Sequence, residues 1–130
     1  DTGLLCQLLG FNNEDRLKKY ANRGSLFENL VISEIIKQNH HNNYNNQLFY
    51  WKESNKTEVD LLIPGANGLN IYEIKSSQTL TYDKYEGLMK FEKISTDPIL
   101  SKTLIHAGKE KTHTRFGCET VSWDKASLQE

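Results

Sequence analysis

Cysteine, proline and long apolar runs are all scarce in this 130-residue sequence, which has two cysteines and two prolines. Cys6 and Cys118 lie far apart and match no zinc-ligand spacing, which argues against a disulfide-rich scaffold and a zinc-finger module. No apolar run approaches the roughly 20 residues of a membrane helix, and no signal-peptide pattern is present. The sequence therefore predicts a cytoplasmic protein with two free thiols.

An excess of positive charge is also missing. The 16 basic and 17 acidic side chains give a formal net charge of -1. A domain that holds DNA by itself usually has a basic surface. Any affinity for nucleic acid must therefore come from a local basic patch or from another part of the molecule. The hydrophobic content of 37% and the charged content of 25% are ordinary for one soluble globular domain.

The first 20 residues differ from the rest of the chain. They contain a short apolar stretch, a Gly-Phe-Asn-Asn break and a charged helical segment. We expect residues 1–20 to be the tail of an upstream region or a linker, and residues 21–130 to form the domain. The chain begins at Asp1 without an initiator methionine, which favours an excised piece of a longer protein.

Apolar periodicity predicts two helices and five strands. The helices cover residues 24–39 and 81–95, and the strands cover residues 48–54, 58–64, 69–77, 102–108 and 115–123. The first helix is apolar around most of its circumference, which predicts a buried helix. An Asn-rich loop follows it, and Asn67-Gly68 predicts a hairpin between the second and third strands. The order, αβββαββ, predicts a mixed α/β sandwich around one sheet.

Charged residues occupy unusual places in the second and third predicted strands. Glu73 and Lys75 are two residues apart, so both project from one face of their strand. Pairing through the hairpin brings Asp60 of the preceding strand close to Glu73. Charges in the middle of strands are costly to bury unless they are paired or bind a metal. A solvated, salt-bridged edge strand is the alternative interpretation of a Glu-X-Lys triplet.

Two carboxylates and a lysine in one place predict a particular chemistry. Oxygen ligands suit hard cations such as Mg²⁺ or Mn²⁺, and magnesium sites usually combine one or two carboxylates with water and substrate phosphate. Such a cation would polarise a phosphodiester and lower the pKa of a bound water. Lys75 would hold that water or stabilise the developing phosphorane charge.

Glu28 is a third candidate acid, on the first predicted helix. On a helical wheel it falls among apolar positions, which is an odd place for a carboxylate without a partner. Ser25 and Glu28 also match the capping-box pattern, in which the glutamate bonds back to the first residue. Metal ligand and helix cap are equally supported by spacing. Glu34 is a weaker candidate on the same helix, and Glu58 shares a strand with Asp60.

This pattern resembles the PD-(D/E)XK (restriction-endonuclease-like) nuclease superfamily, which has a helix acid, an acid on the second strand and Glu-X-Lys on the third. The segments SLFENLVISEI, EVDLLI, YEIKSS and GLMKF are similar, more specifically, to the uncharacterised C-terminal domain of prokaryotic AAA-type ATPases. The opening DTGLL also resembles the stretch that precedes that domain. The resemblance extends from residue 1 to about Gly108.

The resemblance implies roles for individual residues. Asp60 and Glu73 would be metal ligands together with the backbone carbonyl of Ile74, Lys75 would be the catalytic lysine, and Glu28 would complete the site. Ser76 and Ser77 would line the rim. The proline of the superfamily name is absent, because Val59 precedes Asp60. The resemblance also implies an upstream ATP-binding domain as a partner.

Two further groups of residues have both a functional and an ordinary interpretation. The first consists of basic side chains that either contact phosphates or form a solvated loop: Lys102, Lys109, Lys111, His113 and Arg115. The second consists of Phe49, Tyr50 and Trp51, which we predict to be core residues rather than a base-stacking platform.

Two functions are consistent with the sequence. The first is a domain that uses Mg²⁺ or Mn²⁺ to hydrolyse DNA phosphodiester bonds and is coupled to an ATPase. The second is a catalytically silent module of the same fold that regulates the ATPase or recognises a partner or DNA. The intact acid-acid-lysine set favours the enzyme, whereas the charge balance favours the module. The sequence predicts neither the oligomeric state nor a preference for DNA over RNA.

Overall fold

The computed structural model describes residues 23–42, 46–53 and 57–126. Its elements are α3 (Arg23–His41), β1 (Phe49–Lys52), β2 (Glu58–Gly65), β3 (Gly68–Lys75), the 3-10 helix η1 (Tyr82–Tyr85), α4 (Glu86–Ile94), β4 (Ile99–His106), β5 (His113–Arg115), β6 (Cys118–Ser122) and the 3-10 helix η2 (Trp123–Lys125). The predicted N-terminal tail and Cys6 lie outside the described residues, whereas Cys118 is a buried free thiol.

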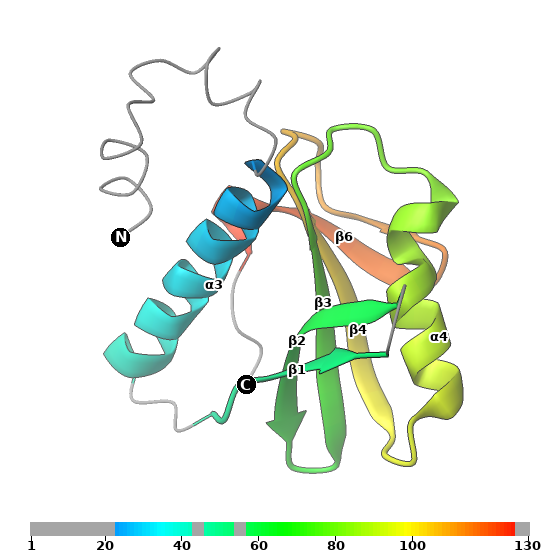
Figure 1. Cartoon of the computed structure of the whole chain (residues 1–130). Coiled ribbons are helices and arrows are strands. Elements are labelled where there is room, and N and C mark those ends of the chain that lie inside the picture. The colour runs from blue at the N-terminus through cyan, green and yellow to red at the C-terminus, as the bar shows by residue number, and fades with distance from the viewer. Residues whose placement is uncertain (1–22, 43–45, 54–56, 127–130) are drawn as a thin grey trace.

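The strands form one six-stranded mixed sheet in the order β1-β2-β3-β4-β6-β5. β1, β2 and β3 pair antiparallel, β3, β4 and β6 pair parallel, and β5 pairs antiparallel with β6. α3 lies on one side of this sheet and α4 on the other (Figure 1). The predicted mixed α/β class is therefore confirmed, and the arrangement is compatible with an α/β nuclease-like fold.

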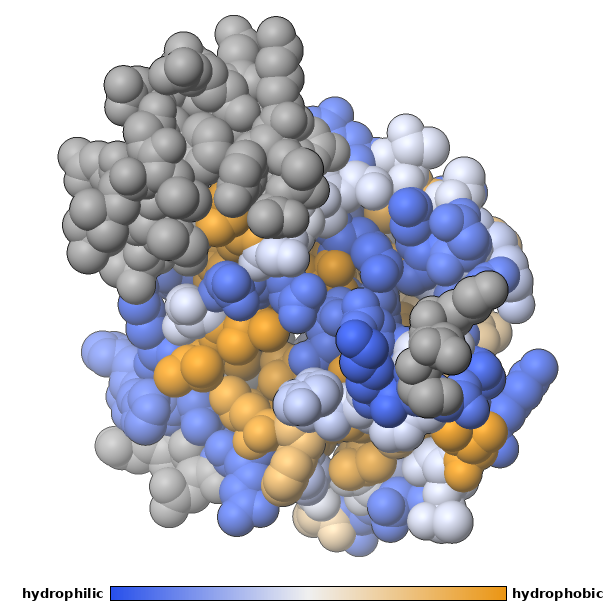
Figure 2. All heavy atoms as spheres, in the orientation of Figure 1, coloured by the Kyte–Doolittle hydropathy of each residue, from blue (hydrophilic) through white to orange (hydrophobic). Residues whose placement is uncertain are grey.

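The α3 side of the sheet is held by branched aliphatic side chains. Val31 and Ile35, four residues apart on α3, are both 3% exposed. This i, i+4 spacing places them on one helix face, against the sheet residues Leu61, Ile63, Tyr72, Ile74, Ile105 and Val121. Figure 2 shows apolar side chains gathered alongside α3 and hydrophilic side chains over most of the same face.

The α4 side has a second apolar core. Leu88 and Phe91 are three residues apart on α4 and pack with the fully buried Tyr85 of η1. The Tyr85 hydroxyl is hydrogen-bonded to Thr120 Oγ1 at 2.7 Å, so its burial leaves no unpaired polar group. Within the described ranges, no helix is both long and apolar enough to cross a membrane.

The last predicted strand is a hairpin, not one strand. β5 and β6 are separated by Phe116 and Gly117, whose φ angles are +52° and +75°. Positive φ at both residues is typical of the two-residue turns that join antiparallel strands. Gly117 adopts this conformation without a steric penalty, whereas Phe116 does not. The sequence pattern hid the turn because an aromatic residue stands where asparagine is usual.

The prediction that the aromatic run of β1 is core was wrong for two of its three residues. Phe49 is 50% exposed and Tyr50 is 78% exposed. Trp51 does pack inward, with its ring 5.3 Å from Phe91 in an edge contact. β1 is an edge strand of four residues, so little of its surface is covered. Aromatic composition fits a strand but does not reveal whether that strand is central.

Candidate metal and phosphodiester site

Asp60 lies at an irregularity in β2. Phe49 pairs with Leu62 and Trp51 with Val59, so a two-residue step on β1 opposes a three-residue step on β2. This extra residue is a β-bulge, which re-aims a side chain and is common beside functional sites. As a result Val59 belongs to the core on the α4 side, while Leu61 belongs to the core on the α3 side. The regular alternation of a β-strand is therefore broken at Asp60.

The Asp60 carboxylate is fixed by the backbone of β3. Paired positions of β2 and β3 extend as far as Leu61 and Tyr72. Beyond that point, the Ile74 backbone N–H donates to Asp60 Oδ2 at 2.7 Å. The carboxylate therefore replaces a backbone carbonyl as the partner of β3. Because Asp60 is 8% exposed, this bond also compensates part of the cost of its burial.

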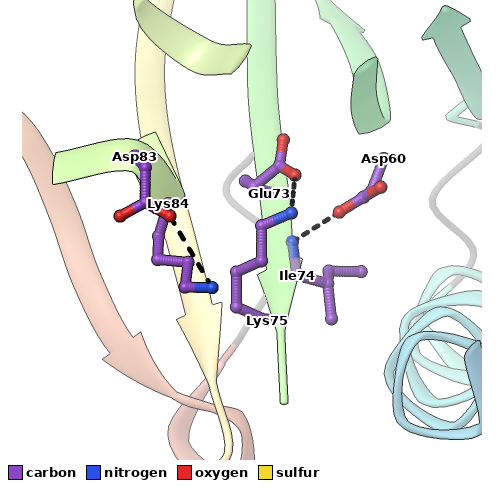
Figure 3. A network of polar contacts seen from close by, with 6 residues as sticks. All are labelled: Asp60, Glu73, Ile74, Lys75, Asp83 and Lys84. Atoms are coloured by element: carbon purple, nitrogen blue, oxygen red, sulfur yellow. Dashed lines mark hydrogen bonds and ion pairs between the residues drawn. The ribbon is translucent and has the colours of Figure 1, made fainter. Parts of the chain in front are cut away.

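Glu73 and Lys75 form an ion pair on β3, as their two-residue spacing predicts. Lys75 Nζ lies 2.6 Å from Glu73 Oε1 (Figure 3), and Glu73 is 2% exposed. The second oxygen, Glu73 Oε2, is buried and accepts no hydrogen bond from an N–H or O–H group in the described part of the chain, although the Asp60 carboxyl group lies close enough to share a proton with Glu73. A buried carboxylate oxygen without a partner is costly, which indicates a place for an additional ligand.

The electrostatic environment of the site favours bound protons or cations. Burial is the largest effect that raises the pKa of Glu73, from 4.5 to about 8, and the nearby Asp60 adds to it while Lys75 opposes it. Burial also raises the pKa of Asp60, although the Ile74 N–H and Lys75 act against the change. Burial lowers the pKa of Lys75, but ionised Glu73 and Asp60 outweigh it, and the pKa is raised overall. Each shift favours more positive charge at this position.

Glu28 of α3 belongs to the same electrostatic group. Burial raises its pKa from 4.5 to about 7, with further contributions from Asp60 and Glu58 and an opposing one from Lys75. The capping interpretation is wrong, because α3 begins at Arg23 and Ser25 therefore lies inside the helix. Glu28 is thus an acid on which the charges of other acids act, rather than a helix cap. Its role as a metal ligand stays a prediction.

The donor set fits a hard divalent cation with few protein ligands. In the part of the chain that the structure describes, no three His, Cys, Asp or Glu side chains form a ready-made metal cluster. Magnesium sites nevertheless commonly use one or two carboxylates and complete their shell with water and phosphate. Asp60 and the unpartnered Oε2 of Glu73 supply two carboxylates of this kind. The Ile74 carbonyl remains a predicted additional ligand.

Gly87 is a residue of the site that the sequence interpretation missed. A Cβ atom on this α4 residue would lie 2.4 Å from the Glu58 carbonyl oxygen and 3.1 Å from Glu73 Oε2. The missing side chain therefore lets α4 approach the strands that hold the two carboxylates. A glycine inside a predicted helix already indicates a close contact of this type. The sequence shows a glycine inside the predicted helix, but it does not reveal which residue lies against that glycine.

We expect Gly87→Ala to destabilise the protein by roughly 1–3 kcal/mol, because the new methyl group overpacks the contact with Glu58. Alanine is otherwise the better helix residue by about 1 kcal/mol. Gly24→Ala is the matched control, since Gly24 is also the second residue of its helix and its Cβ would meet only Ser76 Oγ, at 3.9 Å. Urea unfolding should show opposite signs for the two variants. Equal stabilisation by both would contradict this account of Gly87.

His106 is a second missed residue near the site. It pairs in register with Lys75 across the parallel strands β3 and β4, and it is fully buried. The Gly108 backbone N–H donates to His106 Nδ1 at 3.0 Å, which puts the ring proton on Nε2. Burial lowers the pKa of His106, so the neutral ring is favoured. The sequence predicted the strand that contains His106, but it did not predict that His106 lies beside Lys75 of the adjacent strand.

Most of the other candidate residues lie in ordinary polar surroundings. Glu34 pairs with Lys37 at 3.0 Å, and Lys102 pairs with Glu92 at 2.6 Å. Ser76 and Ser77 are half-buried directly after β3. Glu58 is exposed, but its charge acts on both Asp60 and Glu28.

The fold and the site define a mixed α/β domain with two buried carboxylates and a lysine gathered at one edge of its parallel strands. A protein-family model described as "Domain of unknown function (DUF4143)" matches residues 23–124. The chain therefore belongs to the DUF4143 family. Comparison with curated proteins gives no match.

Proposed function

We propose that this chain is a divalent-metal-dependent nuclease domain that hydrolyses DNA phosphodiester bonds. The observation that supports the proposal most strongly is the buried Asp60–Glu73–Lys75 group, in which one carboxylate oxygen has no partner. A structural ion pair alone would be satisfied by one carboxylate and one ammonium group. The second buried acid is an electrostatic cost unless a bound proton or a cation compensates it.

Asp60 and Glu73 would hold a Mg²⁺ or Mn²⁺ ion together with the Ile74 carbonyl. When bound, the cation supplies polarisation of the phosphodiester and a lower pKa for a coordinated water. The Ile74 N–H orients the Asp60 carboxylate, because it fixes Oδ2 at 2.7 Å and leaves the other oxygen for a ligand. Lys75 places an ammonium group 2.6 Å from Glu73 Oε1, where it can stabilise negative charge that develops on a phosphoryl oxygen.

Glu28 contributes a half-buried carboxyl group from the α3 side. Its pKa of about 7 means that it holds a proton for part of the time at neutral pH. A cation near Asp60 would lower that pKa, since positive charge favours the ionised form. Glu28 would then orient a water or complete the ligand set of the cation.

We also propose that this domain belongs to the PD-(D/E)XK nuclease superfamily and is attached to an ATPase. The helix acid Glu28, the strand acid Asp60 and the Glu73–Lys75 pair follow the order of the PD-(D/E)XK nuclease superfamily, and the bulge at Asp60 re-aims its carboxylate toward β3. The similarity to C-terminal domains of prokaryotic AAA-type ATPases supports an upstream ATPase domain as partner. ATP hydrolysis there would control access of nucleic acid to this site.

One observation favours a second function, a catalytically silent module of the same fold. Lys75 occupies one oxygen of Glu73 at 2.6 Å and already neutralises part of the acidic charge. The formal net charge of -1 also provides no general attraction for DNA. Metal affinity separates the two functions. Calorimetry with Mn²⁺ in the presence of DNA should give a single binding event for the enzyme and none for the module.

The Lys75→Met variant tests the proposed activity. With supercoiled DNA and Mg²⁺ or Mn²⁺, the full chain should nick the substrate, and Lys75→Met should be slower by on the order of 100-fold, because it loses charge stabilisation but keeps a similar volume. Lys37→Met is the matched control: Lys37 is an exposed lysine of α3 whose partner is Glu34. Nicking at the same rate by both variants would remove Lys75 from the mechanism.

A further inference from the structure

Two exposed aromatic rings meet at the turn between β5 and β6. Tyr82 of η1 is 50% exposed and Phe116 of the turn is 40% exposed. Their ring centroids lie 5.0 Å apart with the planes at 88°, an edge-to-face contact. Phe116 also touches the buried Tyr85 in a second edge contact at 5.2 Å. The outer surface of this pair is open to solvent.

The backbone of Phe116 makes its presence there costly. Its φ of +52° lies in the left-handed region, where a bulky L-residue is disfavoured by roughly 1–2 kcal/mol. Asn-Gly is the usual sequence for such a turn, and Phe116-Gly117 differs from it only at the strained residue. A strained, exposed aromatic residue is an observation from which function can be inferred. The contact with Tyr85 explains the buried part of the Phe116 ring, but it does not explain why the ring is 40% exposed.

A cationic side chain lies over one ring of the aromatic pair. The Arg115 guanidinium carbon lies 5.3 Å from the centre of the Phe116 ring. Among the residues that the structure describes, Arg115 forms no ion pair. Its charge is therefore available for an anionic ligand such as a phosphate group.

The aromatic pair lies on the side of the sheet that carries Glu73 and Lys75. Asp83 follows Tyr82 directly, and the charge of Lys75 is one of those that act on it. Figure 3 shows Asp83 and Lys84 of η1 beside Lys75 and Glu73. Asp83 is paired with Lys84 at 3.8 Å, so its negative charge is partly compensated. A ligand on Tyr82 would thus lie on the approach to the acidic site.

We propose that Tyr82, Phe116 and Arg115 form a platform that stacks an unpaired base of single-stranded nucleic acid. Aromatic faces bind bases of any sequence, and a neighbouring cation such as Arg115 binds an adjoining phosphate. A base inside a duplex cannot offer its face to either ring. The platform therefore selects single-stranded or unpaired ends of nucleic acid. The class of ligand rests on the proposed nuclease function, whereas the platform itself rests on the two rings and the Arg115 cation.

Fluorescence anisotropy of labelled oligonucleotides tests the platform in EDTA, where no cleavage occurs. The full chain should bind a single-stranded oligonucleotide, DNA or RNA, at least tenfold more tightly than a duplex of the same length. Tyr82→Ser should weaken single-strand binding by about tenfold, the loss expected for one stacked base. Phe116→Asn should weaken it similarly while the melting temperature is unchanged or higher, because Asn-Gly suits the turn.

Tyr50→Ser is the matched control. Tyr50 is an exposed tyrosine of β1, at the opposite edge of the sheet from β5. The Tyr50→Ser variant should bind the single-stranded oligonucleotide as tightly as the unmodified chain does. Arg115→Ala should reduce the dependence of log affinity on log salt by about one. Absent single-strand binding, or platform variants within twofold of the unmodified chain, would overturn the inference.

Binding and cleavage measured on the same variants show whether the platform or the nuclease function fails. Single-strand binding that depends on Tyr82, in a protein that never cleaves, would retain the platform and reject the nuclease. Cleavage that is unaffected by Tyr82→Ser and Phe116→Asn, together with unaltered binding, would reject only the platform.

Discussion

Asp60→Asn is expected to lower metal-dependent DNA cleavage by about 1,000-fold, equivalent to about 4 kcal/mol of transition-state stabilisation. The substitution removes one negative charge from the cation site. It keeps an oxygen that can accept the Ile74 N–H, the bond that fixes the carboxylate at 2.7 Å. Folding should therefore change little while activity is lost. Rates of supercoiled-DNA nicking at saturating Mn²⁺ measure the effect.

Two further variants separate charge from structure at this position. Asp60→Ala leaves the Ile74 N–H without its partner and should destabilise the protein by roughly 1–3 kcal/mol in addition to its loss of activity. Asp97→Asn removes an exposed carboxylate in the loop before β4 and should have no effect on cleavage. Asp60→Asn activity within tenfold of that of Asp97→Asn would exclude Asp60 as an essential ligand.

Glu73→Gln is expected to change how stability depends on pH. Burial raises the pKa of Glu73 to about 8 in the folded chain, compared with 4.5 for the ordinary side chain. The folded state therefore binds more protons than the unfolded state between these values, and the free energy of unfolding falls as pH rises from about 5 to about 8. Because a tenfold change in proton affinity is worth about 1.4 kcal/mol, the fall should be on the order of 3 kcal/mol.

Glutamine cannot ionise, so most of this fall should disappear in Glu73→Gln. Glu28, whose pKa is raised to about 7, should leave a smaller fall of the same sign, which is offset in part by His106, because its lowered pKa acts in the opposite direction. Guanidinium unfolding of the metal-free protein at pH 5 and at pH 8 measures both effects. Glu92→Gln, at an exposed acid of α4, is the control and should retain the full pH dependence. A parent protein that becomes more stable toward pH 8 would contradict a buried, unpaired carboxylate at Glu73.

The sequence was most informative where local pattern and tertiary contact agree. Alternation along β3 predicted that Glu73 and Lys75 share a face, and their 2.6 Å contact confirms it. The predicted hairpin between β2 and β3 brought Asp60 to the same site, although its two-residue turn is Ala66-Asn67 and not Asn67-Gly68. Helical spacing also identified Val31 and Ile35 as buried, but the prediction that α3 is buried around most of its circumference was wrong, because Ile36 is 39% exposed. All these inferences use a fixed backbone period and one short connection.

What the sequence did not predict depends on neighbours distant in the chain. The bulge at Asp60 arises from pairing with β1, and no local pattern records that register. The exposure of Tyr50 follows from the edge position of β1, which depends on the order of all six strands. Gly87 has a clear purpose only once the Glu58 carbonyl is known to lie against it. The turn at Phe116 was missed because its residue contradicts local preference.

Mn²⁺ binding tests the central claim, that Asp60 and Glu73 hold a divalent cation, most directly. Titration calorimetry of the full chain at pH 7.5 with a single-stranded oligonucleotide present should give one Mn²⁺ site. Asp60→Asn and Glu73→Gln should lose this site, while Lys75→Met and Asp97→Asn should keep it. An unmodified chain that binds no Mn²⁺, or an Asp60→Asn variant that binds it with unaltered affinity, would contradict the claim.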